Sequence, residues 1–210
     1  MRRRPQRQQR GPRALGLTGS IAMGKTTAAR LLTHLGVRVF DADAVVHTLT
    51  GPHGRALPAL AARFPGLVGP AGLDRKKMGA RAFADADALK DLEGILHPLV
   101  HEARTRFLRA AALRRDAVVA LDVPLLFEGG SREVYDLVAV VSAPAFLQKQ
   151  RALRRPGMSA EKLHGVLKRQ MSDHRKRRLA DAVIPSGLGK RETLRRLKQA
   201  LKVAANQREF

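Results

Sequence analysis

The sequence ALGLTGSIAMGKT, at residues 14–26, sets the architecture of this 210-residue chain. The apolar run at 14–18 predicts a buried strand, and residues 19–26 fit the pattern Gly-x-x-x-x-Gly-Lys-Thr in full. Apolar side chains then recur at helical spacing over 25–35. A strand, a glycine loop and a helix in this order predict a loop that binds the phosphates of a nucleotide.

Each part of this loop has a physical task. The glycines let successive backbone N–H groups face one cavity, at a helix start whose partial positive charge attracts phosphate. Lys25 supplies a mobile cation for the β- and γ-phosphates, and Thr26 supplies a hydroxyl for Mg²⁺. The alternative interpretation is a glycine-containing turn before an ordinary helix. The residues expected to bind ATP are Gly19, Ser20, Ile21, Ala22, Met23, Gly24, Lys25, Thr26 and Thr27.

Four further strands are predicted from apolar runs at 37–40, 117–121, 137–141 and 183–184. The first of them completes a strand–helix–strand unit with 14–18, which implies a parallel sheet covered by helices. Residues 51–115 have mostly helical patterns and predict a helical insertion rather than another sheet unit. Its longest helix is expected to begin at Pro98, because proline suits a first helical position. A terminal helix is expected over 192–203.

Three aspartates follow predicted strands. Asp41 and Asp43 come after the second strand, and the carboxyl ends of parallel strands meet at one edge, so both are expected near the phosphates. One of them could accept a proton from an attacking hydroxyl, and Asp43 is the favoured base. Either could instead cap the next helix, and for Asp41 the two interpretations stay open. Asp122 either lies near Mg²⁺, acting through water, or is a turn aspartate.

Residues 148–178 form a very basic helical region, with eleven Lys and Arg residues against two acidic ones. A Pro-Gly pair at 156–157 interrupts its helices. Phosphoryl transfer needs cations around the transferring group, and mobile lids often supply them. Arg151 and Arg155 are spaced by one helical turn, which predicts that they face the same ligand. Most of the other basic residues are interpreted as a solvated helix face.

The net charge of +22 indicates either a polyanion partner or simply a basic surface, and the basic surface is favoured. Aromatic residues make up only 4%, which leaves little to stack on single-stranded nucleic acid. There is no cysteine, so disulfides and thiolate metal sites are excluded. No apolar run reaches the roughly 18–20 residues of a membrane span, and we expect a cytoplasmic enzyme. Residues 1–13 contain six arginines and predict a disordered basic arm.

Several segments together resemble the dephospho-coenzyme A kinase family, in chain order from about Leu15 to Leu201. They are LGLTGSIAMGKTTAARLL, FDADAVVH, GLDRKKMGARAF, LEGILHPLVHEAR, LDVPLLFEGG, RALRRPGMSAEKL and RQMS with the later RRLADAVI. Each segment is a weak signal alone, but the ordered set is specific. The resemblance implies an α/β P-loop nucleoside-kinase-like three-layer fold, with a five-stranded parallel sheet, a helical substrate-binding insertion and a basic lid.

The resemblance also implies an activity, which is ATP-dependent phosphorylation of the ribose 3′-hydroxyl of dephospho-CoA to coenzyme A. On the matching positions, Asp43 would be the general base and Arg155 a lid arginine on the phosphates. His97 and Arg104 would contact the substrate, although His97 could instead orient a helix start. In this hypothesis Mg²⁺ bridges the β- and γ-phosphates, while Lys25 and the lid arginines stabilise the spreading negative charge.

The chain departs from the family pattern in three places. In the glycine loop, the residues that replace the usual ones are Ser20, Ala22 and Met23. After the last strand, Pro185 and Ser186 stand where the family has an asparagine near the adenine. In the lid, Gly165 and Val166 stand where the family often has an arginine, for which Lys168 or Arg169 could compensate.

The expected domains are a basic arm at 1–13, a nucleotide-binding core at 14–50, 116–147 and 179–210, a substrate domain at 51–115 and a lid at 148–178. The expected partners are ATP and dephospho-CoA, with nucleic acid bound only non-specifically through the arm, no membrane, and a monomer favoured. Two rival functions remain. One is another small P-loop kinase acting on a nucleotide or a metabolite, and the other is a basic nucleic-acid-binding P-loop protein.

Overall fold

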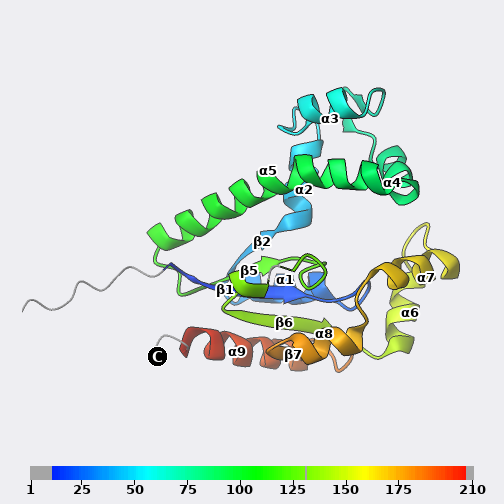
Figure 1. Ribbon diagram of the computed structural model, residues 1–210. Helices are drawn as coiled ribbons and strands as arrows, with labels where there is room; N and C mark the ends of the chain where they lie inside the picture. Colours follow the sequence, from blue (N-terminus) through cyan, green and yellow to red (C-terminus); the bar gives the residue numbers. More distant parts are fainter. Residues whose placement is uncertain (1–10, 131, 207–210) are drawn as a thin grey trace, which may run out of the picture. The chain divides into compact units, whose positions relative to one another are not determined.

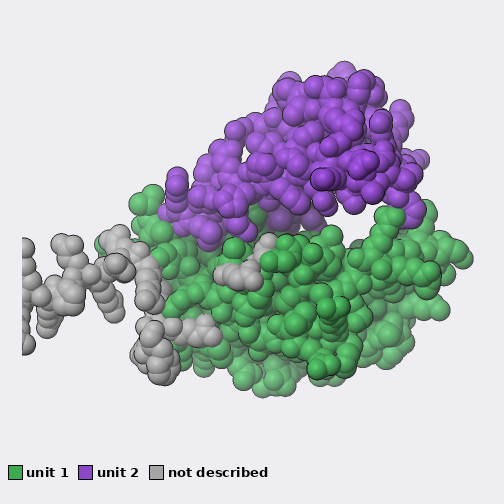
Figure 2. Space-filling view, in the orientation of Figure 1, with its two compact units in different colours: residues 1–40, 110–210 green, residues 41–109 purple. Residues whose placement is uncertain are grey.

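The computed structural model describes residues 11–130 and 132–206. The chain forms two compact units, coloured separately in Figure 2: residues 1–40 with 110–210, and residues 41–109. The first ten positions of the predicted basic arm lie outside the described residues. Its last residue, Arg13, belongs to the first strand and not to an arm. The reason is that the Arg13 N–H bonds to the carbonyl of Ala117, while its guanidinium lies 2.5 Å from Asp136.

The first unit is built on a five-stranded parallel sheet with the strand order β2-β5-β1-β6-β7 (Figure 1). β1 pairs in parallel with β5 and β6, and β6 pairs in parallel with β7. The strands are β1 at Arg13–Thr18, β2 at Arg38–Asp41, β5 at Val118–Asp122, β6 at Leu137–Ser142 and β7 at Ala182–Pro185. All five predicted strands are therefore confirmed, with bounds that shift by one residue at most.

Helices cover this sheet. α1 (Lys25–His34) and α9 (Lys190–Asn206) pack in the main core, where each fully buried leucine contributes about 1.5–3 kcal/mol. Buried leucines of β1, α1 and α9 meet there: Leu15, Leu17, Leu32 and Leu197. Gly16 faces other neighbours, because a Cβ at this position would lie 2.8 Å from Leu126 and from Tyr135. The segment after β5, which continues into a 3₁₀ turn at Arg132–Val134, therefore packs against β1.

Three further helices form the basic region: α6 (Ala145–Leu153), α7 (Ala160–Arg169) and α8 (Asp173–Leu179). The predicted interruption at 156–157 lies between α6 and α7. Serine side chains begin the next two helices, since Ser159 accepts the N–H of Lys162 and Ser172 accepts the N–H of Arg175. None of the described helices is both long and apolar enough to cross a membrane.

The second unit contains α2 (Ala42–Thr50), α3 (Leu57–Arg63), α4 (Arg75–Ala84) and most of α5 (Ala86–Leu113). Leu60 and Phe64 are fully buried in its core, and Met78 is almost so. The unit is mostly helical, as predicted, but it also contains two short strands that the sequence pattern did not indicate. β3 (Val68–Gly69) and β4 (Gly72–Leu73) form a small antiparallel hairpin, because Gly72 adopts a φ of +96° that other residues rarely reach.

The longest helix does not begin at Pro98. It is α5, which starts at Ala86 and contains Pro98 in its interior. Asp85 provides the true start signal, since its Oδ1 accepts the N–H groups of Asp87 at 2.9 Å and Ala88 at 3.1 Å. Pro98 removes one backbone donor, but the other turns of this 28-residue helix hold across it. An aspartate cap therefore sets this helix start, and the proline preference for first positions misplaces it.

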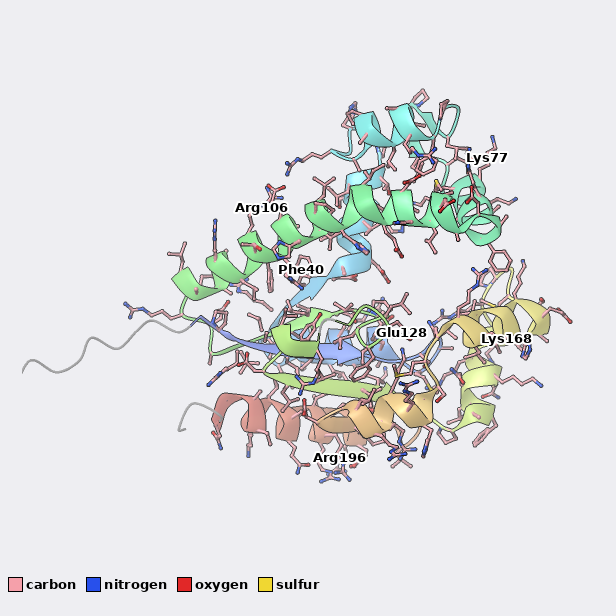
Figure 3. The ribbon with its side chains drawn as sticks, in the orientation of Figure 1. Phe40, Lys77, Arg106, Glu128, Lys168 and Arg196 are labelled. Atoms are coloured by element: carbon pink, nitrogen blue, oxygen red, sulfur yellow. The ribbon has the colours of Figure 1, made fainter. Side chains whose placement is uncertain are left out.

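A buried ion pair ties α8 to the segment after β5. The side chain of Lys176 is fully buried, and its Nζ lies 2.9 Å from Oε1 of Glu128 and 3.3 Å from the Pro124 carbonyl oxygen. Glu128, which Figure 3 labels, also accepts the N–H of Met171 at 2.8 Å. One carboxylate thus satisfies a buried ammonium and fixes the chain that leads into α8. Glu128 therefore has a structural role.

We expect Glu128→Ala to lower the free energy of unfolding by about 3–5 kcal/mol, because it leaves a buried ammonium without its carboxylate. Urea unfolding followed by circular dichroism will measure the change. Glu102→Ala is the matched control, since Glu102 pairs with Arg55 at the exposed surface and its loss is expected to leave the midpoint nearly unchanged. Equal midpoints for the two variants would contradict this role for Glu128.

Candidate active site

Residues 19–24 form the loop that joins β1 to α1. Gly24 caps α1 with a φ of +94°, and its carbonyl accepts the N–H of Ala28 at 3.1 Å. A Cβ on Gly19 would lie 2.7 Å from the carbonyl oxygen of Val141, so only glycine fits there. The first N–H groups of a helix have no partner within the helix and attract anions. The loop therefore places an anion-binding helix start directly after the strand.

Lys25 and Asp122 form an ion pair beside this loop. The Lys25 Nζ lies 2.6 Å from Oδ1 of Asp122, and their side chains are only 17% and 5% exposed. The pair follows from the sheet register, because Asp122 at the end of β5 stands opposite Leu17 near the end of β1. The sequence pattern assigns Lys25 to the phosphates and leaves Asp122 either near Mg²⁺ or in a turn, and it does not predict that the two side chains contact each other. The parallel pairing of their two strands was the signal that could have shown it.

The middle of the loop is held by two glutamines from the basic region. Gln170 Oε1 accepts the N–H of Ile21 at 3.0 Å, and Gln148 Nε2 donates to the Ile21 carbonyl at 2.9 Å. Ala22 is buried in a small apolar cluster with Ala152 of α6 and Leu163 of α7. Both polar groups of Ile21 are therefore satisfied by side chains more than 120 residues away in the sequence. Local sequence patterns carry no signal for these contacts.

The three unusual loop residues have different surroundings. Ser20 is buried, and its hydroxyl has no hydrogen-bond partner among the described residues. Ala22 has a φ of +60°, a left-handed conformation that costs a residue with a Cβ about 1–2 kcal/mol. Met23 is 2% exposed, and its sulfur accepts the N–H of Ala143 at 3.2 Å. The side chains of Ala22 and Met23 are therefore part of the packing beneath the loop.

Arg151 and Arg155 do not share a helix face. α6 ends at Leu153, and Arg155 lies exposed in the following turn, where its N–H bonds to the Ala152 carbonyl. The Pro-Gly pair that follows prevents the helix from continuing, so helical spacing no longer applies to Arg155. Arg151 is half-buried, and its Nη1 and Nη2 each lie 2.9 Å from an oxygen of Ser186. Only Arg151 of this pair is thus fixed beside the loop.

The candidate acceptor-side residues belong to the second unit. Asp41 caps α2, since its Oδ1 accepts the N–H of Ala44 at 2.9 Å. Asp43 lies in the first turn of α2 with an exposed side chain. His97 and Arg104 are both on α5, where His97 is exposed and Arg104 is half-buried. The capping interpretation therefore fits Asp41, which leaves Asp43 as the aspartate whose carboxylate is not used at the helix start.

The donors available to a metal are few. Among the described residues there is no group of three or more His, Cys, Asp or Glu that could hold one. Mg²⁺ in kinases is bound by one or two protein groups together with substrate phosphates. The exposed hydroxyl of Thr26, in the first turn of α1, and the carboxylate of Asp122 are donors of this kind. These residues fit a magnesium ion that arrives with a nucleotide.

Sequence comparison gives one consistent family. The family model for dephospho-CoA kinase matches residues 13–189. A dephospho-CoA kinase from Rhodospirillum rubrum is 55% identical over 192 residues, which cover 90% of this chain and 90% of the relative. One from Novosphingobium aromaticivorans is 51% identical over 182 residues, which cover 87% of this chain and 90% of the relative. The similarity thus includes the glycine loop, the second unit and the basic region.

Solved structures show a related fold. A crystal structure of a Thermus thermophilus protein has a TM-score of 0.82 and 31% identity, and the match covers 92% of this chain and 98% of that chain. A dephospho-CoA kinase from Campylobacter jejuni has a TM-score of 0.62 at 21% identity, over 93% and 98% of the two chains. A shikimate kinase from Acinetobacter baumannii has a TM-score of 0.53 at 18% identity, over 95% and 96%. The last two show a similarity of fold alone.

Proposed function

Because the chain belongs to the dephospho-CoA kinase family, we propose roles for its residues in the reaction of that family. The enzyme phosphorylates the ribose 3′-hydroxyl of dephospho-CoA with ATP and so produces coenzyme A. The observation that supports our residue roles is the position of Lys25, at the start of α1 and 2.6 Å from the carboxylate that ends β5. An ammonium held at a helix start is suited to the terminal phosphates of a nucleotide.

The donor side consists of residues 19–27 and two arginines. Backbone N–H groups of the loop and of the first turn of α1 bind the phosphates of ATP. The ammonium of Lys25 stabilises the negative charge that spreads over the transferring group. Arg151 adds a second positive charge from α6, and Arg155 adds a third when the turn after α6 moves over the nucleotide. In-line transfer then needs mainly positioning and charge stabilisation from the protein.

Mg²⁺ is the metal that we propose for this reaction. Thr26 would hold it through its hydroxyl, and Asp122 through a water molecule. When bound together with the nucleotide, the ion would neutralise negative charge on its phosphates. Asp122 can serve this purpose while it also orients the ammonium of Lys25, because a carboxylate has two oxygens and accepts several hydrogen bonds.

We expect Thr26→Val to weaken Mg²⁺-dependent binding of ATP by about tenfold, because the variant keeps the side-chain shape and removes the hydroxyl ligand. Calorimetric titration of ATP at several Mg²⁺ concentrations measures this without turnover. Thr33→Val on the same helix is the control, since its hydroxyl only bonds to the Ala29 carbonyl. Removal of divalent ions with EDTA is expected to abolish activity, and added Mg²⁺ to restore it. Unchanged Mg²⁺ dependence in Thr26→Val would contradict the ligand role.

On the acceptor side, we propose that Asp43 takes the proton of the ribose 3′-hydroxyl. Asp41 is engaged in capping α2, whereas Asp43 stands exposed in the first turn of the same helix. The acceptor itself would be held by residues 51–115, with His97 and Arg104 as its polar contacts. The imidazole and the guanidinium suit the phosphates of dephospho-CoA, because both donate hydrogen bonds to anionic oxygens.

An acceptor panel tests the reaction directly. Purified enzyme is incubated with ATP, Mg²⁺ and either dephospho-CoA, a nucleoside monophosphate or shikimate, and the products are identified by mass spectrometry. Dephospho-CoA is expected to gain one phosphoryl group and to give ADP in equal amount. A faster reaction with another acceptor would favour the rival interpretation of a different small P-loop kinase.

Three further expectations remain proposals: a monomer, a cytoplasmic location, and non-specific binding of nucleic acid through residues 1–13. Exposed basic side chains also occur on the described part of the chain, such as Lys168 on α7 and Arg196 on α9. The side chain of Arg196 points away from the sheet (Figure 3). Charge of this kind binds polyanions with an affinity that falls steeply with salt. We therefore expect any nucleic-acid binding to disappear at moderate salt while kinase activity remains.

A further inference from the structure

Ser186, the first residue after β7, connects Arg151 to the glycine loop. The Ser186 hydroxyl donates to the Met23 carbonyl at 2.5 Å and accepts from Nη1 of Arg151 at 2.9 Å. Its main-chain carbonyl accepts from Nη2 of the same guanidinium at 2.9 Å. One residue therefore anchors both branches of the guanidinium and, through the same hydroxyl, the loop.

This anchor is itself rigid. The N–H of Ser186 donates to the carbonyl of Ser142 at 2.8 Å, which extends the pairing of β7 with β6 by one more hydrogen bond. A serine side chain has one rotatable bond before its oxygen, so a fixed backbone fixes the hydroxyl closely. An arginine side chain, by contrast, loses much conformational entropy when it is held in one geometry. The sheet therefore fixes Ser186, and Ser186 in turn holds the long side chain of Arg151 in one position.

The anchored guanidinium lies directly beside the phosphate-binding loop. A Cβ on Gly24 would lie 2.9 Å from the hydroxyl oxygen of Ser186 and 3.6 Å from Nη1 of Arg151. Gly24 immediately precedes Lys25 and caps the start of α1. The Arg151 guanidinium bonds to two neutral oxygens of Ser186, and it takes part in none of the ion pairs within 4.0 Å among the described residues. A half-buried positive charge with neutral neighbours favours an anionic ligand, and the helix start beside it favours phosphate.

We propose that Ser186 is a positioning residue for nucleotide binding, which acts by holding the Arg151 guanidinium against the loop at Gly24. The inference rests on the proposed contact between Arg151 and ATP. It goes beyond that contact because it assigns a role to a residue that itself need not touch the nucleotide. The role belongs to the binding step, so the loss of Ser186 should raise the KM for ATP and leave the KM for dephospho-CoA unchanged.

Ser186→Ala tests the proposal, because it removes the hydroxyl and keeps the main-chain carbonyl. We expect the KM for ATP to rise about tenfold, the size expected for a lost hydrogen bond to a charged group. The value of kcat is expected to change less than about twofold, and calorimetry is expected to show equally weakened binding of Mg-ADP.

Thr193→Val is the matched control. Thr193 is buried in the adjacent first turn of α9, and its hydroxyl donates to the Pro185 carbonyl at 2.9 Å. The variant removes a buried hydroxyl from the other end of the same connection, so it is expected to lower Tm without a change in the KM for ATP. An equal rise in KM in Thr193→Val would show that the loop after β7 matters as a whole, and it would overturn a specific role for Ser186.

A double-mutant cycle with Arg151→Ala separates the contact of Arg151 with ATP from the positioning of Arg151 by Ser186. If Ser186 acts through Arg151, then adding Ser186→Ala to Arg151→Ala raises the KM for ATP less than about twofold further. Fully additive effects would overturn the positioning role. An unchanged KM in Ser186→Ala, with a raised KM in Arg151→Ala, would overturn it while leaving Arg151 as an ATP contact. An unchanged KM in Arg151→Ala would remove the contact on which the inference rests.

Discussion

Lys25→Ala will lower kcat by at least about 100-fold at saturating ATP, the usual loss when one charge-stabilising donor is removed from an active site. The ammonium is positioned at the start of α1 and is fixed by Asp122 at 2.6 Å, so its charge is held where the terminal phosphates are expected. The measurement is steady-state release of ADP with dephospho-CoA as the acceptor. Lys198→Ala on α9 is the control for loss of one positive charge, because that side chain is exposed.

The same variant requires a check of folding. Lys25→Ala removes the ammonium partner of Asp122, whose side chain is 5% exposed, and this loss is expected to reduce stability as well. A second variant, Lys25→Ala with Asp122→Asn, removes the buried charge and should recover part of the Tm without recovering kcat. Activity within a few-fold of the parent in Lys25→Ala would exclude the phosphate-binding role of residues 19–26.

The sheet and the loop could be predicted from the sequence because their signals are local. Each strand of a parallel sheet is buried on both faces and therefore reads as a short apolar run, as Leu137–Ser142 does. The loop requires glycine at both ends for backbone reasons, and Gly19 and Gly24 show those reasons directly. Neither inference needs knowledge of distant contacts. The structure confirms the five strands, with small shifts in their bounds, and the loop between β1 and α1, whereas phosphate binding by this loop stays a prediction.

Interactions between distant segments could not be predicted in this way. The two glutamines that hold Ile21 follow it in the sequence by more than 120 residues. The serine that holds Arg151 follows that arginine by 35 residues. Local rules also failed where two of them competed. Pro98 suits a helix start, but the Asp85 cap begins the helix earlier in the chain. The helical spacing of Arg151 and Arg155 does not hold, because α6 ends at Leu153.

Asp43→Asn is the second variant with a large expected effect, because it removes the proposed base while keeping the size and shape of the side chain. We expect kcat to fall by about 100-fold or more, the range in which general bases contribute. The KM for ATP is expected to stay close to the parent value, since the carboxylate acts on the acceptor hydroxyl and not on the nucleotide. Single-turnover measurements with saturating ATP and dephospho-CoA will report the chemical step directly.

Asp41→Asn is the matched control, because it changes a neighbouring carboxylate that has a visible structural role. Asp41 accepts the N–H of Ala44 at the start of α2, and asparagine caps helices about as well as aspartate. Its kcat and Tm are therefore expected to remain near those of the parent. A comparable loss of kcat in both variants would indicate that charge at the start of α2 matters in general. Of the two aspartates, only Asp43 has a carboxylate that is not used to cap α2. Turnover of Asp43→Asn within a few-fold of the parent would therefore contradict its role as the base, because another group would have to accept the proton.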